Sequence, residues 1–146
     1  MLQTEIETRP FVVFQLASEW FVLPTAQVRS IERWRLATSV PGTPPIIVGI
    51  VNQRGTLVTV LDVRGLLGLQ TDTPGRTTRL LFIRVAEIDV ALIADQVADL
   101  LDLDVQRTEP APHRVSGYSD GLIHTPFGLA TILNLDAILA SVQGVA

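Results

Sequence analysis

The sequence predicts a mainly β domain in which two similar barrels share one hydrophobic core. Short apolar runs rich in Val, Ile and Leu recur along the 146 residues, and turn signals separate them at regular spacing. Only brief stretches have helical character. The chain has no cysteine, which excludes disulfides and thiolate metal sites. A chain of this length buries roughly 68–70% of its unfolded surface, so it can fold without crosslinks.

In the first half, two expected hairpins flank a helical turn and a Pro/Gly loop at 41–45. The predicted strands are 11–16 with 20–23, and 46–51 with 56–61. The segment 25–31 is predicted as a helical turn with Thr25 as its N-cap, since Val28 and Ile31 are three residues apart. Asp62 is expected to cap a short helix over 63–67 that Gly68 ends.

The second half is predicted to contain the same kinds of element. A polar loop over 70–76 leads into it, and a Pro-rich linker covers 109–112. Strands are expected at 80–85, 90–94 and 97–103, followed by a hairpin of 122–123 with 129–133 and a helix over about 136–142.

The two halves also resemble each other in sequence. At an offset of 69, residues 11–31 match 80–100, with identical pairs at Ala17/Ala86, Leu23/Leu92, Gln27/Gln96 and Val28/Val97. At an offset of 72, residues 57–63 match 129–135. Because both segments agree at nearly one offset, we interpret the chain as a duplicated unit of about seventy residues that forms two similar barrels.

One segment carries a resemblance to a known family. Residues 49–64 read Gly-Ile-Val-Asn-Gln-Arg-Gly-Thr-Leu-Val-Thr-Val-Leu-Asp-Val-Arg, similar to a G-x-x-N-x-R-G strand that turns into an apolar strand closed by D-L/V-R. Phe14-x-Leu16, Val28-x-x-Ile31 and 92–97 agree with the pattern around it. On these residues the chain resembles the CheW-like family of chemotaxis adaptors, or coupling proteins, over roughly 10–142.

The resemblance implies a fold and a function. It implies two SH3-like five-stranded β-barrels sharing one core, with short helices that include one at the C-terminus. It implies a domain at 10–143 made of two pseudo-repeated barrel subdomains, with tails at 1–9 and 144–146. It also implies an adaptor without enzymatic activity or cofactor, which couples the regulatory domain of a chemotaxis histidine kinase to the cytoplasmic tips of chemoreceptors in signalling arrays.

The turn at 52–55 is the expected contact point with a partner. Gly55 permits positive φ and Asn52 can bond its own backbone, so the tip is expected to be rigid and to hold Arg54 outward. A guanidinium there can fork onto a carboxylate or carbonyls. By resemblance, the partner-binding surface is an apolar groove between the barrels that involves Val28, Ile31, Gly49, Asn52, Arg54, Leu80 and Leu100. Ser30 and Arg79 depart from the residue types common in the family.

Composition excludes several other classes of protein. The net charge is −4 and all eleven basic residues are scattered arginines, which argues against nucleic-acid binding. The longest uncharged run, 36–53, contains three prolines, so no membrane insertion is expected and we expect a cytoplasmic protein. Apolar residues make up 47% of the chain and mean hydropathy is +0.38, which fits either a large core or a surface left for a partner.

Two chemical motifs in the sequence do not indicate a catalytic or metal site. Residues 117–121 match G-x-S-x-G, but a hairpin follows instead of the helix that a hydrolase requires. His113 and His124 lack metal-ligand spacing, so no metal site is expected. Two alternatives to the chemotaxis adaptor stay open from sequence: a freestanding sensor that binds a small ligand between its barrels, and an adaptor that serves surface motility or another output.

Overall fold

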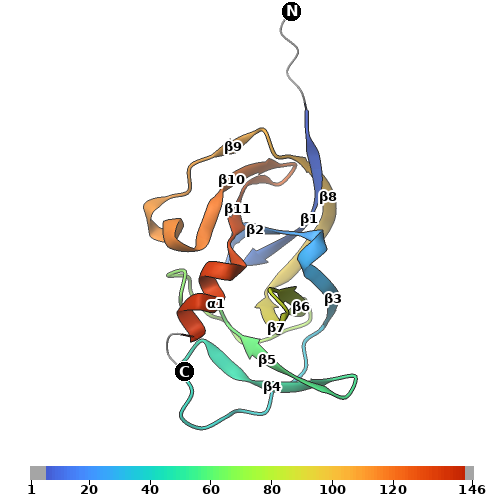
Figure 1. Ribbon diagram of the computed structural model, residues 1–146, viewed down its shortest axis with the longest axis vertical. Helices are drawn as coiled ribbons and strands as arrows, with labels where there is room; N and C mark the ends of the chain where they lie inside the picture. The colour runs from blue at the N-terminus through green and yellow to red at the C-terminus, as the bar shows by residue number, and fades with distance from the viewer. Residues whose placement is uncertain (1–5, 144–146) are drawn as a thin grey trace, which may run out of the picture.

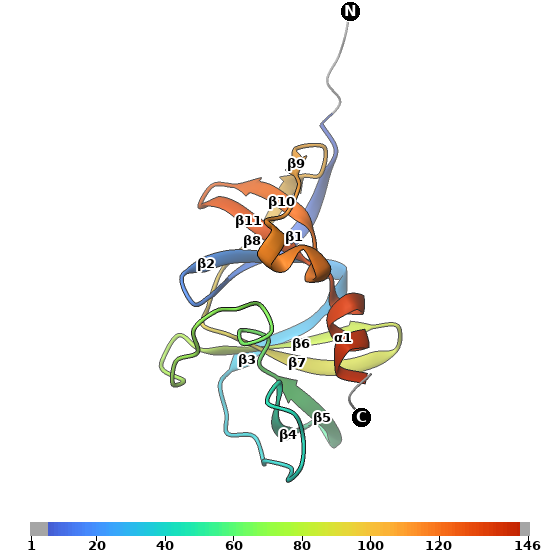
Figure 2. The same ribbon diagram turned by 90° about the vertical axis from the view of Figure 1, so that its left-hand side faces the viewer.

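The chain folds into two β-barrels, one above the other, with a helix beside their boundary (Figures 1 and 2). The computed structural model describes residues 6–143. Its strands are β1 Thr8–Leu16, β2 Glu19–Pro24, β3 Val28–Arg33, β4 Ile47–Gln53, β5 Thr56–Leu61, β6 Arg79–Val85, β7 Ile88–Ala94, β8 Gln96–Asp104, β9 Thr108–Glu109, β10 Ser119–Thr125 and β11 Gly128–Leu133. Short 3₁₀ helices lie at Thr25–Gln27 and His113–Tyr118, and α1 spans Leu135–Gln143.

Each barrel borrows a hairpin from the other half of the chain. Barrel A has the strand order β8-β1-β2-β11-β10-β9, so the first hairpin pairs with strands of the second half. Barrel B has the order β3-β6-β7-β5-β4, so the β6–β7 hairpin pairs with strands of the first half. The junctions match, because β2 runs parallel to β11 and β5 runs parallel to β7. The two barrels are therefore interlocked through exchanged strands.

The predicted repeat appears in the backbone geometry. Ala17 and Ala86 hold equivalent places in the hairpin turns and have φ of 58° and 50°. The amide of Asp62 donates to the carbonyl of Ile46, and 72 residues later the amide of Asn134 donates to Tyr118, at 2.8 and 2.9 Å. The two-barrel fold expected from the sequence is confirmed, with the exchanged hairpins as an added feature.

Hydrophobic side chains form three clusters rather than one. The largest lies between the barrels and includes Phe14 and Phe21 from barrel A, Ile83 and Leu92 from barrel B, and the inner face of α1. A small cluster that includes Val58 and Phe82 fills the interior of barrel B. The matching cluster in barrel A includes Ala130, which is 72 residues after Val58, and Val13, which is 69 residues before Phe82. The shared core expected from the sequence is present, and each barrel also has an interior of its own.

A buried arginine ties the barrels together beside the shared core. Arg64 is 3% exposed and forms a two-pronged bond with Asp62, from Nε at 2.9 Å and Nη2 at 2.9 Å. Its Nη1 donates to Asp95, at the β7–β8 connection, at 2.7 Å. The other oxygen of Asp95 accepts from the amide of Ala17 at 2.6 Å. Both bonds to Asp62 and the charge of Asp95 raise the pKa of Arg64, so the cation persists at all ordinary pH values.

Two helical expectations are wrong in extent. Residues 25–27 form a single 3₁₀ turn, and the Thr25 hydroxyl makes no capping bond. The segment from Val28 is strand β3, in which a bulge lies between Val28 and Ser30. The extra residue lets Val28 and Ile31 face the shared core together, although their spacing imitates a helix. Residues 64–68 form turns only, while Asp62 does accept from the amide of Arg64 at 3.1 Å.

Most of the expected tail at 1–9 and all of that at 144–146 lie outside the described residues, and β1 begins at Thr8. Within residues 6–143, no helix combines the length and the apolar character needed to cross a bilayer.

The arginine bridge generates a stability prediction. We expect Arg64→Met to lower the free energy of unfolding by about 3 kcal/mol, because two partly buried carboxylates lose their counter-charge and hydrogen bonds. Arg84→Met is the matched control, since Arg84 and Asp89 form an exposed pair worth roughly 0–1 kcal/mol. Urea unfolding measures both variants, and equal losses would show that the Arg64 bridge has no special structural weight.

Candidate functional site

The β4–β5 turn presents one arginine in a fixed conformation. Its two central residues, Arg54 and Gly55, have φ of 52° and 87°, as in the tight turns that match the twist of a hairpin. The Asn52 side-chain oxygen accepts from the amide of Gly55 at 2.8 Å. Arg54 is exposed, as predicted, and its backbone is held by the turn and by the last strand pair, Gln53 with Thr56.

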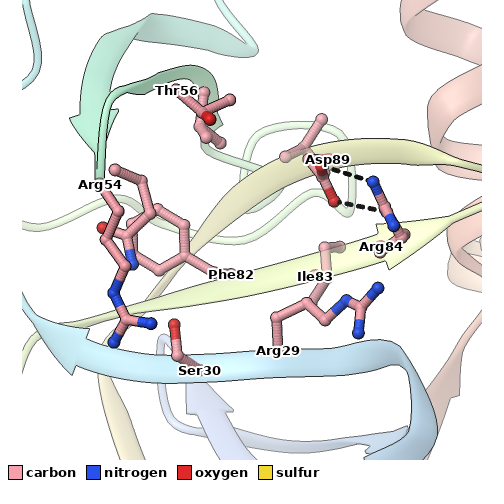
Figure 3. A pocket seen from close by; sticks show the side chains of 11 residues that line it. Arg29, Ser30, Arg54, Thr56, Phe82, Ile83, Arg84 and Asp89 are labelled. Carbon is pink, nitrogen blue, oxygen red and sulfur yellow. Dashed lines mark hydrogen bonds and ion pairs between the residues drawn. The ribbon is translucent and has the colours of Figure 1, made fainter.

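Arg54 stands at the edge of a cleft of about 330 Å³ at the open end of barrel B (Figure 3). Strands β3, β4, β5, β6 and β7 supply the rest of the wall. The lining residues are Arg29, Ser30, Gln53, Arg54, Thr56, Val58, Phe82, Ile83, Arg84, Asp89 and Val90. The cleft therefore combines an apolar floor with cationic and hydroxyl groups at its rim.

The charges at the rim are unequally matched. Arg84 forms a two-pronged pair with Asp89, at 3.0 and 3.2 Å. Arg29 and Arg54 form no ion pair with any residue between 6 and 143. In Figure 3 the Arg54 guanidinium lies beside the Ser30 hydroxyl, whereas the Arg29 side chain extends away from Ser30 toward the side of Arg84. Two unneutralised positive charges thus border the cleft of a chain whose net charge is −4.

A polar network holds the turn against the edge strand β3. Gln53 donates to Glu32, and Arg35 donates to Glu32 at 3.0 Å, to the Gln53 side chain at 2.7 Å and to the Asn52 carbonyl at 2.8 Å. The hydrogen bond from Gln53 is the largest of the influences that lower the pKa of Glu32. This network closes barrel B between β3 and β4 and fixes the base from which Arg54 projects.

The structure distributes the expected partner-binding residues among different environments. Val28 and Ile31 are half-buried against the shared core, and Leu100 is 55% exposed on β8. None of these three lines the cleft that contains Arg54. Leu80 is 0% exposed inside barrel B, so its place in a contact surface is wrong. The next residue of β6, Leu81, is also 0% exposed, because this part of the strand is covered on both faces.

Gly49 has a structural role at a close crossing of two chain segments. A Cβ at this position would lie 2.3 Å from the carbonyl oxygen of Thr38. Thr38 and Ile50 exchange backbone hydrogen bonds at 2.8 Å, which brings the two segments this close. Gly121, at the equivalent position of barrel A, has the same relation to the carbonyl of Glu109. Gly49 is buried, so it shapes the strand beneath the turn instead of offering a surface.

Sequence reasoning missed Arg29 and the strand residues that form the cleft. Arg29 is the extra residue of the bulge in β3, and no local turn signal marks it. Phe82 and Ile83 reach the cleft because β6 pairs with β3, a contact between residues about fifty positions apart. The internal repeat could have drawn attention to Arg29, because the corresponding residue of barrel A, Ala98, carries no charge.

Comparisons with known proteins agree with this architecture. The family model described as CheW-like domain matches residues 10–143. The chemotaxis protein CheW of Bacillus subtilis is 30% identical over 143 residues, covering 94% of this chain and 92% of that protein. A chemotaxis protein CheW of Helicobacter pylori is 24% identical, covering 91% and 82%. The crystal structure of the scaffolding protein TtCheW from Thermoanaerobacter tengcongensis superposes with a TM-score of 0.82 at 25% identity, covering 92% of this chain and 90% of that one.

The crossing at Gly49 leads to a testable expectation. Gly49→Ala should destabilise the protein by about 1–3 kcal/mol, because the new methyl group forces the Thr38 carbonyl away from β4. Gly65→Ala is the control, since a Cβ at Gly65 meets nothing within 4 Å. Thermal and denaturant unfolding of the two variants decides the question, and a Gly49→Ala protein as stable as the control would contradict the structural role.

The polar network gives a second, pH-based expectation. Gln53→Ala should raise the pKa of Glu32 toward its ordinary value, because the largest stabilising hydrogen bond to the carboxylate is removed. A lowered folded-state pKa adds stability above the ordinary carboxyl pKa, and this stability is lost as pH falls through the lowered value. The variant should therefore lose that contribution at neutral pH. Carboxyl ¹³C NMR titration measures the change, with Gln70→Ala as a control that leaves the Glu32 titration in place.

Proposed function

This chain belongs to the CheW-like domain family, and on that premise we propose that it is a non-enzymatic adaptor that couples a chemotaxis histidine kinase to chemoreceptors. Chemotaxis proteins of the same family match nearly its whole length, which supports a coupling role. The partners in this proposal are the regulatory domain of the kinase and the cytoplasmic tips of the receptors. The protein then works in the cytoplasm and reaches the membrane only through those receptors.

The single observation that carries the proposal is the exposed, pre-set Arg54 turn. A contact residue on a flexible loop would lose conformational entropy when it binds. Here the Asn52 bond and the positive φ of Arg54 fix the backbone before any partner arrives. The guanidinium offers several donors in a planar fork, which suits carboxylate or carbonyl groups on another protein. Such a preorganised projection on a two-barrel scaffold fits a docking function.

Exposed apolar side chains support a protein partner. Leu36 is 86% exposed, Leu57 is 70% exposed and Leu100 is 55% exposed. Leu57 is the second residue of β5 after the Arg54–Gly55 turn, so exposed apolar surface lies close to the turn, on the face of β5 opposite to Thr56 and Val58. Interfaces between proteins commonly place an apolar centre next to arginines that make specific polar contacts. The high apolar content noted in the sequence thus fills a large core and also leaves surface for binding.

The adaptor proposal predicts the effect of reversing one charge. Arg54→Glu should leave the melting temperature nearly unchanged, because the side chain is exposed and has no ion-pair partner within residues 6–143. Binding to a receptor fragment should weaken by about 2–5 kcal/mol if the contact is desolvated in the complex. Arg107→Glu, an equal charge change in the turn after β8, serves as the control and should bind normally.

The experiment combines co-purification with a kinase assay. The full chain is tested for co-purification with the regulatory domain of a chemotaxis histidine kinase and with a receptor fragment. Kinase activity is then measured with and without receptor. Stimulation of the kinase only when the adaptor and receptor are both present supports the proposal. A protein that is folded but binds neither partner contradicts it, and unchanged receptor binding by Arg54→Glu removes Arg54 from the contact.

A further inference from the structure

A second cleft lies at the opposite end of the β3–β6 pair from the Arg54 turn. It has a volume of about 360 Å³ and forms where β3 ends and β6 begins, beside the loop before β6. Its lining residues are Arg33, Trp34, Gly75, Arg76, Thr78 and Arg79, and none of them is acidic. Three guanidinium side chains therefore share one cavity in a chain whose net charge is −4.

The charge of this cleft is not neutralised within the described part of the chain. Arg33, Arg76 and Arg79 form no ion pair with any residue between 6 and 143. Arg79 is fixed in the wall, because its Nη1 donates to the carbonyl oxygens of Arg76 at 2.9 Å and Thr78 at 3.0 Å. Arg33 and Arg76 are exposed, and their guanidinium groups donate to no residue of that range. All three cations thus keep hydrogen-bond donors for a ligand.

Two of the three arginines lie directly opposite each other. Arg33 pairs with Arg79 in the antiparallel register of β3 and β6, and both side chains line the cleft. Like charges at directly opposite positions of a sheet are destabilising. Arg76 adds a third positive charge from the loop before β6. A ligand with two or more negative charges relieves this repulsion, whereas a single carboxylate leaves two of the three positive charges unmatched.

Barrel A has the same strand pairing without the arginines. At the repeat offset of 69, Asp102 corresponds to Arg33 and Pro10 corresponds to Arg79. Pro10 pairs with Asp102 in the register of β1 and β8, as Arg79 pairs with Arg33 in barrel B. Glu7 stands at the position of the third arginine. One barrel is therefore built with two acids and a proline at these positions, so the fold does not require the cationic cleft of the other barrel.

An aromatic side chain borders the arginines. Trp34 is half-buried and packs against the interior cluster of barrel B. It also lines both the arginine cleft and a neighbouring cavity of about 460 Å³. Thr71, Asp72 and Thr73 add polar groups to the wall of this second cavity. The residue of barrel A that corresponds to Trp34 is Leu103, which is 4% exposed, so an indole open to a ligand is specific to barrel B.

We propose that this cleft binds a purine nucleoside diphosphate or triphosphate, with the phosphates held by the three arginines and the base stacked on Trp34. The planar guanidinium fork matches phosphate oxygens, and charge-assisted bonds of this kind are stronger than neutral ones. Two or three phosphates carry enough negative charge to balance three arginines. Every base has a flat face that can stack on an aromatic ring, and a purine presents the larger one. The threonines and Asp72 of the second cavity supply partners for the polar edge of the base. Nucleotide binding is a property beyond the proposed adaptor function.

Titration calorimetry of the full chain tests the ligand class. The ligands are ADP, GDP, their monophosphates and inorganic pyrophosphate, without added metal ion. We expect saturable binding of ADP or GDP. The monophosphate should bind about tenfold more weakly because it has one phosphate fewer, and pyrophosphate about tenfold more weakly because it has no base. Failure of both diphosphates to bind overturns the proposal, as does a monophosphate that binds as tightly as its diphosphate. Pyrophosphate binding as tight as the better diphosphate also overturns it, since the cleft is then a site for any compact polyanion.

Charge variants place the ligand in the cleft. Arg33→Gln and Arg76→Gln each remove one positive charge and should weaken the diphosphate about tenfold, while Arg107→Gln, in the turn after β8, should bind as the parent does. The melting temperature of free Arg33→Gln should equal or exceed that of the parent, because the repulsion opposite Arg79 is removed. Amide NMR spectra show whether each variant is folded. Normal diphosphate binding by both folded cleft variants overturns the assignment.

A variant of the aromatic side chain separates the base from the phosphates. Trp34→Leu introduces the residue that barrel A has at this position. It should weaken the diphosphate about tenfold and leave pyrophosphate binding as in the parent, because only the stacked base is lost. A folded Trp34→Leu protein that binds the diphosphate normally contradicts the placement of the base.

The Arg54 cleft at the other end of the β3–β6 pair provides a further control. Arg54→Glu changes only that cleft and should bind the diphosphate as the parent does. Loss of nucleotide binding by Arg54→Glu, together with normal binding by Arg76→Gln, would place the ligand in the Arg54 cleft and overturn the assignment. Neither kinase nor receptor takes part in the titration, so its outcome is independent of the adaptor proposal.

Discussion

The shared apolar layer between the exchanged hairpins is the constraint on which the rest of the molecule depends. Residues of β1, β2, β6 and β7 meet there, and each of these strands also serves the barrel of the opposite half. Neither half of the chain can complete its own sheet, so each barrel lacks two strands without the other. Burial of this layer therefore holds the two barrels together as well as stabilising each of them. The Arg64 bridge lies beside the layer and links Asp62 to Asp95.

A rigid relation between the barrels matters because the surface features stand on the elements that the shared layer holds. The chain leaves barrel A after β2, passes through a 3₁₀ turn and enters β3 of barrel B, where Arg29 lines the cleft. Glu32 on the same strand is linked to Gln53, directly before the Arg54 turn. The orientation of both arginines thus follows from one edge strand and its hydrogen bonds. The backbone around both arginines is therefore ordered by contacts within the chain.

Local patterns predicted the elements well, and pairing between distant segments accounts for most errors. The strand at 56–61 and the turn at 52–55 follow from alternation and from Asn and Gly chemistry, which act over a few residues. The bulge at Arg29 changes the apparent period, so Val28 and Ile31 imitate a helix. Leu80 was expected in a groove from the resemblance to the family, and its apolar character alone does not distinguish a surface position from an interior one. Its burial depends on the exchanged hairpin, which no short window contains.

Duplication explains why the two barrels can share a design and differ at their open ends. The positions that build the fold are kept in both copies, including the glycines at 49 and 121 and the positive φ of Ala17 and Ala86. The positions around the open ends differ, because they are not needed by the core. In barrel A the place of Asp89 is taken by Trp20, and a ring stack replaces the polar rim. The core therefore makes the same demands on both barrels, and the contrast between a stacked ring pair at one open end and a polar rim at the other lies in positions that the core leaves free to vary.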